Sequence, residues 1–162
     1  MIAVGFWCRC HKPNWWVAAL VVGALCRCQA CSVGLYLPYE SLDSACLSCQ
    51  DVVSGSTTPQ AGTSSADDCL CPEGSYFEPA TSATHPQLRG RCVECPHGAV
   101  CPAGSDLASI KLRPGYWRTS GSSSDVKACE NPDACIGGEG AGACAEGYTG
   151  PVCAVCDDGY SE

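Results

Sequence analysis

The sequence predicts a small disulfide-rich fold of short β-hairpins in an elongated ladder, with a signal-peptide helix at the N-terminus and little other helix. Three observations support this prediction. The chain has 17 Cys among 162 residues, and more than about 8% Cys in a short chain is typical of a disulfide scaffold. From residue 31 onward, Leu, Val, Ile and Phe are too scarce for a large apolar core. Turn formers are frequent, with 18 Gly and 11 Pro.

Residues 1–30 predict a secretory signal peptide. An apolar stretch at residues 15–26 has the length of a signal core, but it is shorter than the roughly 20 residues that a membrane span needs. Cleavage is expected after Ala30; cleavage after Cys26 is the alternative, and it would leave Cys28 in the mature chain. An uncleaved anchor or a short amphipathic helix is the competing interpretation. The residues that precede the apolar stretch and can carry positive charge are Arg9, His11 and Lys12.

Cysteine usage and charge narrow the compartment and the partners. Cytosolic thiols are kept reduced, so a disulfide framework belongs to the secretory pathway and to the extracellular space or cell surface. Removal of residues 1–30 leaves thirteen Cys and changes the formal charge from -8 to -11. Nucleic acid is excluded as a partner because binding it requires a basic surface. An odd number of cysteines also leaves at least one thiol without a partner in the chain.

Two stretches of the chain share one cysteine frame. The pattern C-x-x-G-x-Y occurs at residues 31–36 and again at 71–76, and each copy is followed by C-x-x-C, at 46–49 and 92–95. The Gly predicts a positive φ where the chain turns, and the Tyr is expected to cover a neighbouring disulfide. The polar run at residues 54–68 has neither helical nor strand periodicity, so the cysteines beside it must determine its course.

This order of motifs resembles the cysteine-rich, EGF-like module of ephrin receptors, and its ladder is similar to that of tumour necrosis factor receptors. The resemblance covers residues 31–101. It implies that successive cysteines pair in sequence order, which here gives Cys31 with Cys46, Cys49 with Cys69, and Cys71 with Cys92.

The second half of the chain departs from this frame. Residues 95–102 resemble the start of another copy, but the chain then has no further Cys until Cys129. In this interval, Tyr116 and Trp117 are candidate recognition residues, although packing over a disulfide is the favoured role for both. Residues 120–124, all Ser and Gly, predict an exposed loop.

The last third of the chain resembles a second family. Residues 144–153, CAEGYTGPVC, resemble the closing part of an EGF or laminin-type EGF module, which implies that Cys144 pairs with Cys153. In a laminin-type unit the next Cys opens a final loop, so Cys156 is expected to lack a partner within this chain. The pairing of the other four cysteines stays open between two sets: Cys95 with Cys101 and Cys129 with Cys135, or Cys95 with Cys129 and Cys101 with Cys135.

These motifs together predict a domain order. The combination also resembles the ectodomains of large surface proteins of algae and other protists, so membrane attachment is expected only through a downstream segment outside this chain. The predicted segments are a signal peptide at 1–30, ephrin-receptor-like repeats at 31–70 and 71–101, a Gly-Tyr-Trp turn with a Ser-rich loop at 102–128, and an incomplete EGF or laminin-EGF-like module at 129–162.

Two other chemistries could use the cysteines. Four thiolates from Cys46, Cys49, Cys69 and Cys71 could make a tetrahedral zinc site, but passage through the secretory pathway would oxidise them. Either C-x-x-C could serve as a redox dithiol, but that motif works at a helix start beside a βαβ core, which the sequence does not predict.

Other catalytic or metal-binding arrangements are not predicted. The three His residues, His11, His85 and His97, do not lie in a recognisable catalytic frame, and Asp157 with Asp158 would need further ligands to bind calcium. We therefore expect a non-enzymatic extracellular module without cofactor, serving as a stalk or as a recognition or adhesion surface for an unidentified protein partner. A secreted thiol-disulfide oxidoreductase or a Cys-rich metal-binding protein is the alternative.

Overall fold

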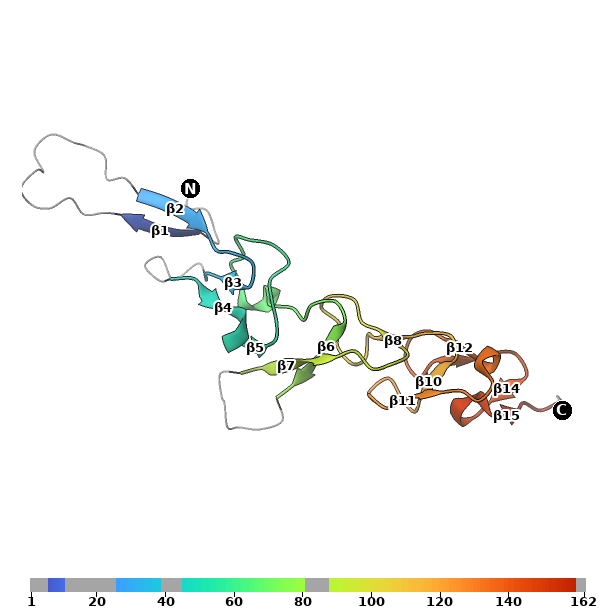
Figure 1. Cartoon of the computed structure of the whole chain (residues 1–162). Coiled ribbons are helices and arrows are strands. Elements are labelled where there is room, and N and C mark those ends of the chain that lie inside the picture. The colour runs from blue at the N-terminus through green and yellow to red at the C-terminus, as the bar shows by residue number, and fades with distance from the viewer. Residues whose placement is uncertain (1–5, 11–25, 39–44, 81–87, 160–162) are drawn as a thin grey trace, which may run out of the picture. The chain divides into compact units, whose positions relative to one another are not determined.

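The computed structural model describes residues 6–10, 26–38, 45–80 and 88–159 (Figure 1). All regular structure in these ranges is short: the strands have two to five residues, and the helical segments are single 3-10 turns. The predicted fold class, a small disulfide-rich protein of short β-hairpins with almost no helix, is confirmed. No helix in the described ranges is long and apolar enough to cross a membrane.

The chain divides into two compact units, residues 1–70 and 71–162. In the first unit, β1 pairs with β2 and β3 with β4, both antiparallel. Its elements are β1 (Phe6–Cys10), β2 (Cys26–Ala30), β3 (Leu35–Tyr36), β4 (Leu47–Ser48), η1 (Cys49–Asp51), β5 (Val53–Ser54) and η2 (Ala66–Asp68).

Within its described residues, the second unit is a series of five antiparallel hairpins, each made of two strands that follow one another in the chain. The hairpins are β6 (Ser75–Pro79) with β7 (Gly90–Glu94), β8 (Ala99–Val100) with β9 (Lys111–Leu112), β10 (Tyr116–Arg118) with β11 (Val126–Ala128), β12 (Cys135–Gly137) with β13 (Ala143–Cys144), and β14 (Tyr148–Thr149) with β15 (Val155–Cys156). The 3-10 turns η3 (Pro132–Ala134) and η4 (Pro151–Cys153) precede β12 and β15.

The N-terminal segment differs from the helix predicted for it. Strands β1 and β2 pair over their full length, so the described parts of the expected signal peptide are extended. Cys26, the last residue of the expected apolar core, begins β2. The rest of that core lies outside the described residues.

One backbone unit recurs five times among the described residues. Two copies end at Arg113 and Asp157, whose N–H groups donate to the carbonyls of Gly98 (2.8 Å) and Gly147 (2.9 Å). We call the other three copies, which end at a Cys, rungs.

Each rung begins with a turn whose Gly has a positive φ of 84° or 85°, a conformation that Gly adopts without steric cost. A strand leaves this turn, a second strand returns, and the residue that ends the return donates its N–H to the carbonyl of the turn Gly. These hydrogen bonds run from Cys49 to Gly34 (3.0 Å), from Cys95 to Gly74 (2.9 Å) and from Cys129 to Gly115 (2.9 Å).

The same rungs agree in strand register. In each, the residue after the turn Gly pairs with the residue before the closing Cys: Leu35 with Ser48, Ser75 with Glu94, and Tyr116 with Ala128. The first rung belongs to the first unit and the other two to the second. The third crosses the division expected between residues 128 and 129, because β10 lies before that point and the closing Cys129 after it.

The third rung has no disulfide where the first two have one. In those rungs a disulfide joins the residue three before the turn Gly to the residue three before the closing Cys, as in Cys71 with Cys92. In the third rung these positions are Leu112 and Val126. Leu112 is 4% exposed, and Val126 packs against the apolar cluster that contains it. The interval without Cys therefore contains both strands of a rung that apolar packing closes.

Within the described ranges, three small clusters form the buried interior, and cysteines belong to each. Tyr36 packs with Cys49 and Cys69 in the first unit. In the second unit, Tyr76 lies in a cluster with Cys101, and a separate cluster surrounds three further cysteines. The clusters are small because the chain has few apolar residues, and crosslinks supply stability that a larger core would otherwise provide.

Candidate functional site

From residue 31 onward, the described cysteines form six disulfides, which include every pair that the family resemblances imply. For the four cysteines whose pairing the sequence leaves open, the structure joins neighbours. Cys95 bonds to Cys101 and Cys129 to Cys135, each with a sequence separation of six. Cys156, by contrast, is exposed and free.

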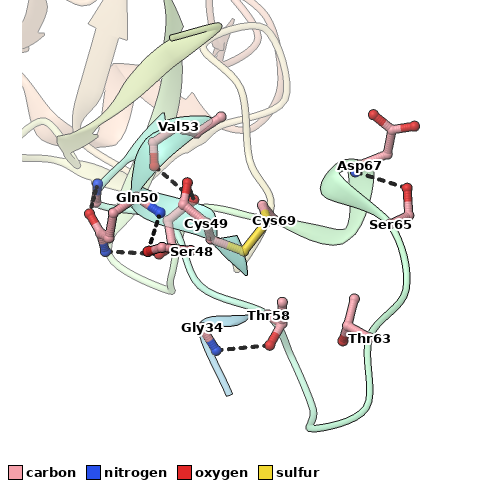
Figure 2. Close-up of a disulfide and its surroundings, with 12 residues drawn as sticks. Gly34, Ser48, Cys49, Gln50, Val53, Thr58, Thr63, Ser65, Asp67 and Cys69 are labelled. Carbon is pink, nitrogen blue, oxygen red and sulfur yellow. Dashed lines mark hydrogen bonds between the residues drawn. A yellow bond between two sulfur atoms is a disulfide. The ribbon is translucent and has the colours of Figure 1, made fainter. Parts of the chain in front are cut away.

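The polar run at residues 54–68, which follows the first rung, is ordered by side-chain hydrogen bonds near the Cys49 and Cys69 disulfide (Figure 2). Thr58 and Ser56 are each 1% exposed. The Thr58 hydroxyl accepts the N–H of Gly34 at 2.9 Å, and the Ser56 hydroxyl donates to the carbonyl of Val53 at 2.8 Å. A run that reads as solvated loop is thus partly an interior segment. Because the run has neither helical nor strand periodicity, its sequence pattern does not indicate this burial.

Each rung has a face over its turn Gly, and this face is covered in only two rungs. A Cβ placed on Gly34 would lie 3.6 Å from the Thr57 hydroxyl, and one placed on Gly115 would lie 3.4 Å from the Cβ of Pro132. A Cβ placed on Gly74 would meet no atom of the described residues within 4 Å. Among the three rungs, the second is therefore open at its turn.

A cavity of about 350 Å³ lies over this open turn, and we call it the second-rung pocket. The loop closed by the Cys95 and Cys101 disulfide forms most of its wall. The Gly74 N–H donates to the carbonyl of Cys101 at 2.9 Å, which ties the turn to that loop. Its other lining residues include Glu73, Glu94, His97, Val100 and Arg113.

Three charged side chains of the pocket have no internal partner. In the part of the chain that the structure describes, Glu73, Glu94 and Arg113 make no side-chain hydrogen bond or ion pair. Glu94 lies opposite Ser75 in the β6 and β7 hairpin, so both carboxylates belong to the same end of that hairpin. Arg113 directly follows β9, and its N–H donates to the carbonyl of Gly98 at 2.8 Å.

Tyr116 and Trp117, the candidate recognition residues, are both half-buried and take part in packing. The Tyr116 ring meets the His97 ring edge-on, with centroids 5.5 Å apart. The same ring lies so close to Gly98 that a Cβ placed there would overlap it. Trp117 packs against the cluster that contains Cys129, Cys135 and Cys153.

Arg118 is a structural residue that the sequence did not reveal. Its side chain is 0% exposed and has no acidic partner among the described residues. Nε donates to the carbonyl of Gly140, and Nη1 donates to those of Leu107 (2.8 Å) and Ser123 (3.3 Å), while Nη2 has no partner within the same residues. Burial lowers the pKa of the guanidinium by desolvating its charge. Arg118 therefore links three loops in the second unit.

The placement of the cysteines does not match either alternative chemistry as the sequence framed it. All four cysteines of the zinc interpretation are in disulfides, and no group of three or more potential metal ligands occurs in the described ranges. Within each C-x-x-C motif the two cysteines bond to other partners rather than to each other. Neither motif is a closed redox pair.

The remaining candidate residues are not brought together. His11 and His85 lie outside the described residues, whereas His97 contacts Tyr116, with 3.4 Å between Nδ1 and the phenol oxygen. Asp157 and Asp158 are exposed, and the Asp157 carboxylate accepts the N–H of Asp158 at 2.9 Å.

Comparison with known proteins relates half of the chain to one cysteine-repeat protein. Over 79 residues, 49% of its length, the chain is 37% identical to the cysteine repeat modular protein A of Toxoplasma gondii. The chain spans about 2% of the length of that relative. No protein-family model and no solved structure matches the chain. The chain is thus a cysteine-rich repeat module, and its disulfides and this relative indicate an extracellular or secreted protein.

Proposed function

We propose that the chain is a non-enzymatic part of a larger cell-surface protein and serves there as a stalk or a protein-recognition surface. The observation that carries this proposal is the pairing of neighbouring cysteines in six disulfides, which hold short hairpins and their loops in place. The similarity to a small part of a much longer cysteine-repeat protein supports the assignment to a larger molecule. The likeness to ephrin-receptor and laminin-type modules, and a signal peptide at residues 1–30, belong to the same proposal.

Rigidity is the physical basis of such a function. A loop that is already fixed by a disulfide and by backbone hydrogen bonds loses little conformational entropy when a partner binds it. Small scaffolds use this effect because their cores are too small to hold loops by packing alone. A crosslinked series of rungs can therefore present side chains at low ordering cost.

Disulfide mapping tests the proposal. The full chain is expressed through a eukaryotic secretory pathway, alkylated without reductant, and analysed by mass spectrometry. We expect a secreted protein with six closed bridges, an alkylated Cys156 and an N-terminus at residue 31. Retention in the cytosol, or alkylation of the cysteines at 46–49 or 92–95 before reduction, would contradict the proposal and favour a thiol-disulfide oxidoreductase.

A further inference from the structure

We propose that the second-rung pocket binds a basic side chain, Lys or Arg, that a loop of a partner protein presents. This inference rests on the proposed recognition function and assigns it a site. The pocket is the cavity of about 350 Å³ over Gly74, with Glu73 in the turn before β6, Glu94 at the end of β7, and Arg113 between β9 and the turn of the third rung.

The comparison among rungs locates the site. In the first rung, the chain covers its own turn with Thr57 and Thr58, and the Thr58 hydroxyl accepts the turn Gly N–H. In the third rung, Pro132 packs against the turn. The second rung has the same turn and register, and the Gly74 N–H donates to the Cys101 carbonyl. Gly74 is nevertheless exposed, and a Cβ placed on it would meet no described atom within 4 Å, so among the three rungs only this turn has open space over it.

The charges select the class of occupant. Glu73 and Glu94 are two carboxylates against the single guanidinium of Arg113, and none of the three has an internal partner within the described ranges. His97 Nδ1 lies 3.4 Å from the Tyr116 hydroxyl. The excess of carboxylates favours a cation, and Arg113 can donate to a main-chain carbonyl of the same incoming segment. The chain as a whole is also acidic, with a formal charge of -8.

A disulfide and a backbone hydrogen bond fix the walls of the pocket in the absence of a ligand. The Cys95 and Cys101 disulfide closes the loop, and the Gly74 N–H binds the carbonyl of Cys101. On the other side, the Tyr116 ring backs Gly98. The volume lies at the lower end of the roughly 300–1,000 Å³ of ligand pockets, which suits one long side chain with its adjoining backbone.

A titration with short peptides tests this inference. The isotope-labelled, oxidised full chain is titrated with acetyl-Gly-Lys-Gly-amide, and in parallel with the Glu and Leu counterparts, while amide shifts are followed by NMR. We expect the Lys peptide to shift the amides of Gly74, Gly98 and Val100 selectively, and added salt to weaken this effect. In the double variant Glu73→Gln with Glu94→Gln, the affinity should fall at least about fivefold, the equivalent of about 1 kcal/mol.

The matched control variant is Glu130→Gln with Asp133→Asn. It removes two exposed carboxylates near the third rung and should leave the titration unchanged. The inference is overturned if the Glu peptide shifts the pocket amides instead, if the Lys peptide shifts them equally in the double variant, or if no peptide shifts them. Disulfide mapping of the same sample separates the two proposals. If the disulfides are closed and no peptide shifts the pocket amides, only the proposal for the pocket is rejected. If the disulfides are open, the proposed function as a crosslinked module is rejected.

Discussion

Leu112 and Val126 occupy the two positions of the third rung that a disulfide joins in the first and second rungs. Leu112 is buried, and Val126 packs against the cluster around it. The hydrogen bond between the Cys129 N–H and the Gly115 carbonyl, at 2.9 Å, is the same as in the crosslinked rungs. The disulfide is therefore not what gives the rung its register.

Replacement of this apolar pair by cysteines is expected to create an additional disulfide. In the variant Leu112→Cys with Val126→Cys, the two positions correspond to Cys71 and Cys92, so the bond should form during secretion without backbone movement. A loop of this size predicts a gain of about 3 kcal/mol in the free energy of unfolding, less the lost apolar packing. Peptide mapping without reductant detects the new disulfide, and thermal unfolding measures the change in stability. Two alkylatable thiols in the secreted double variant would show that the positions are not equivalent.

Arg118 is expected to tolerate no substitution, although it forms no ion pair with a described residue. Arg118→Lys keeps the charge, but its single ammonium cannot reproduce a fork that reaches the carbonyls of Gly140, Leu107 and Ser123. We expect Arg118→Lys to lower the free energy of unfolding by about 1–3 kcal/mol. Arg118→Ala should lower it further because all three carbonyls lose their donor. Chemical denaturation gives these values. In the control Arg113→Lys, at an exposed arginine, the free energy of unfolding should stay within about 0.5 kcal/mol of the wild-type value.

Two glycines with the same backbone conformation are expected to differ in their response to Ala. Gly74 and Gly98 have φ values of 85° and 84°, but only Gly98 lies against a ring, that of Tyr116. Gly74→Ala should cost about 1–2 kcal/mol for the left-handed conformation alone. Gly98→Ala should cost at least about 3 kcal/mol because overlap is added.

A double-mutant cycle assigns that difference. Combining Gly98→Ala with Tyr116→Ala removes the overlapping ring, so we expect a coupling free energy on the order of 1–3 kcal/mol between the two substitutions. Equal losses at Gly74 and Gly98, or strictly additive losses in the cycle, would contradict the packing of the ring on Gly98.

Asp106 is expected to titrate below its ordinary pKa of 3.8. Hydrogen bonds from Ser109 lower this pKa, first through the side chain and then through the backbone N–H, which lies 2.8 Å from Oδ1. Since the folded pKa is below the unfolded one, the carboxylate stabilises the fold above the unfolded pKa, and this contribution is lost as the pH falls through the folded pKa. Carboxyl NMR measures the pKa. In Ser109→Ala it should rise toward 3.8, whereas an unchanged pKa would reject this cause.

The cysteine and glycine spacing was sufficient to predict the fold class. A Cys three residues before a Gly specifies a turn, and the next C-x-x-C specifies the return, so local rules describe a hairpin without a large core. The pairing of Cys95 with Cys101 could not be decided in this way. It depends on the loop that binds the Gly74 N–H through the Cys101 carbonyl, and such a contact has no sequence signature.

The third rung and its arginine were hidden for a related reason. A search by cysteines cannot find a rung whose pair is Leu112 and Val126, although the spacing from Gly115 to Cys129 resembles that from Gly34 to Cys49. Arg118 finds its acceptors 5, 11 and 22 residues away, and loops of irregular backbone bring them together. Burial of the polar side chains at Ser56 and Thr58 likewise follows from tertiary contacts that composition does not report.

The hydrogen bond to the turn glycine has a consequence for how such proteins diverge. A duplicated copy can lose both half-cystines together and keep its alignment with its neighbours, because the main chain still closes on the same carbonyl. A disulfide can then be lost or gained by substitution of both its cysteines while the number of copies stays the same. Counting cysteine pairs therefore underestimates the number of copies of this backbone unit in the chain, because the third rung keeps the hydrogen bond and the register without the pair.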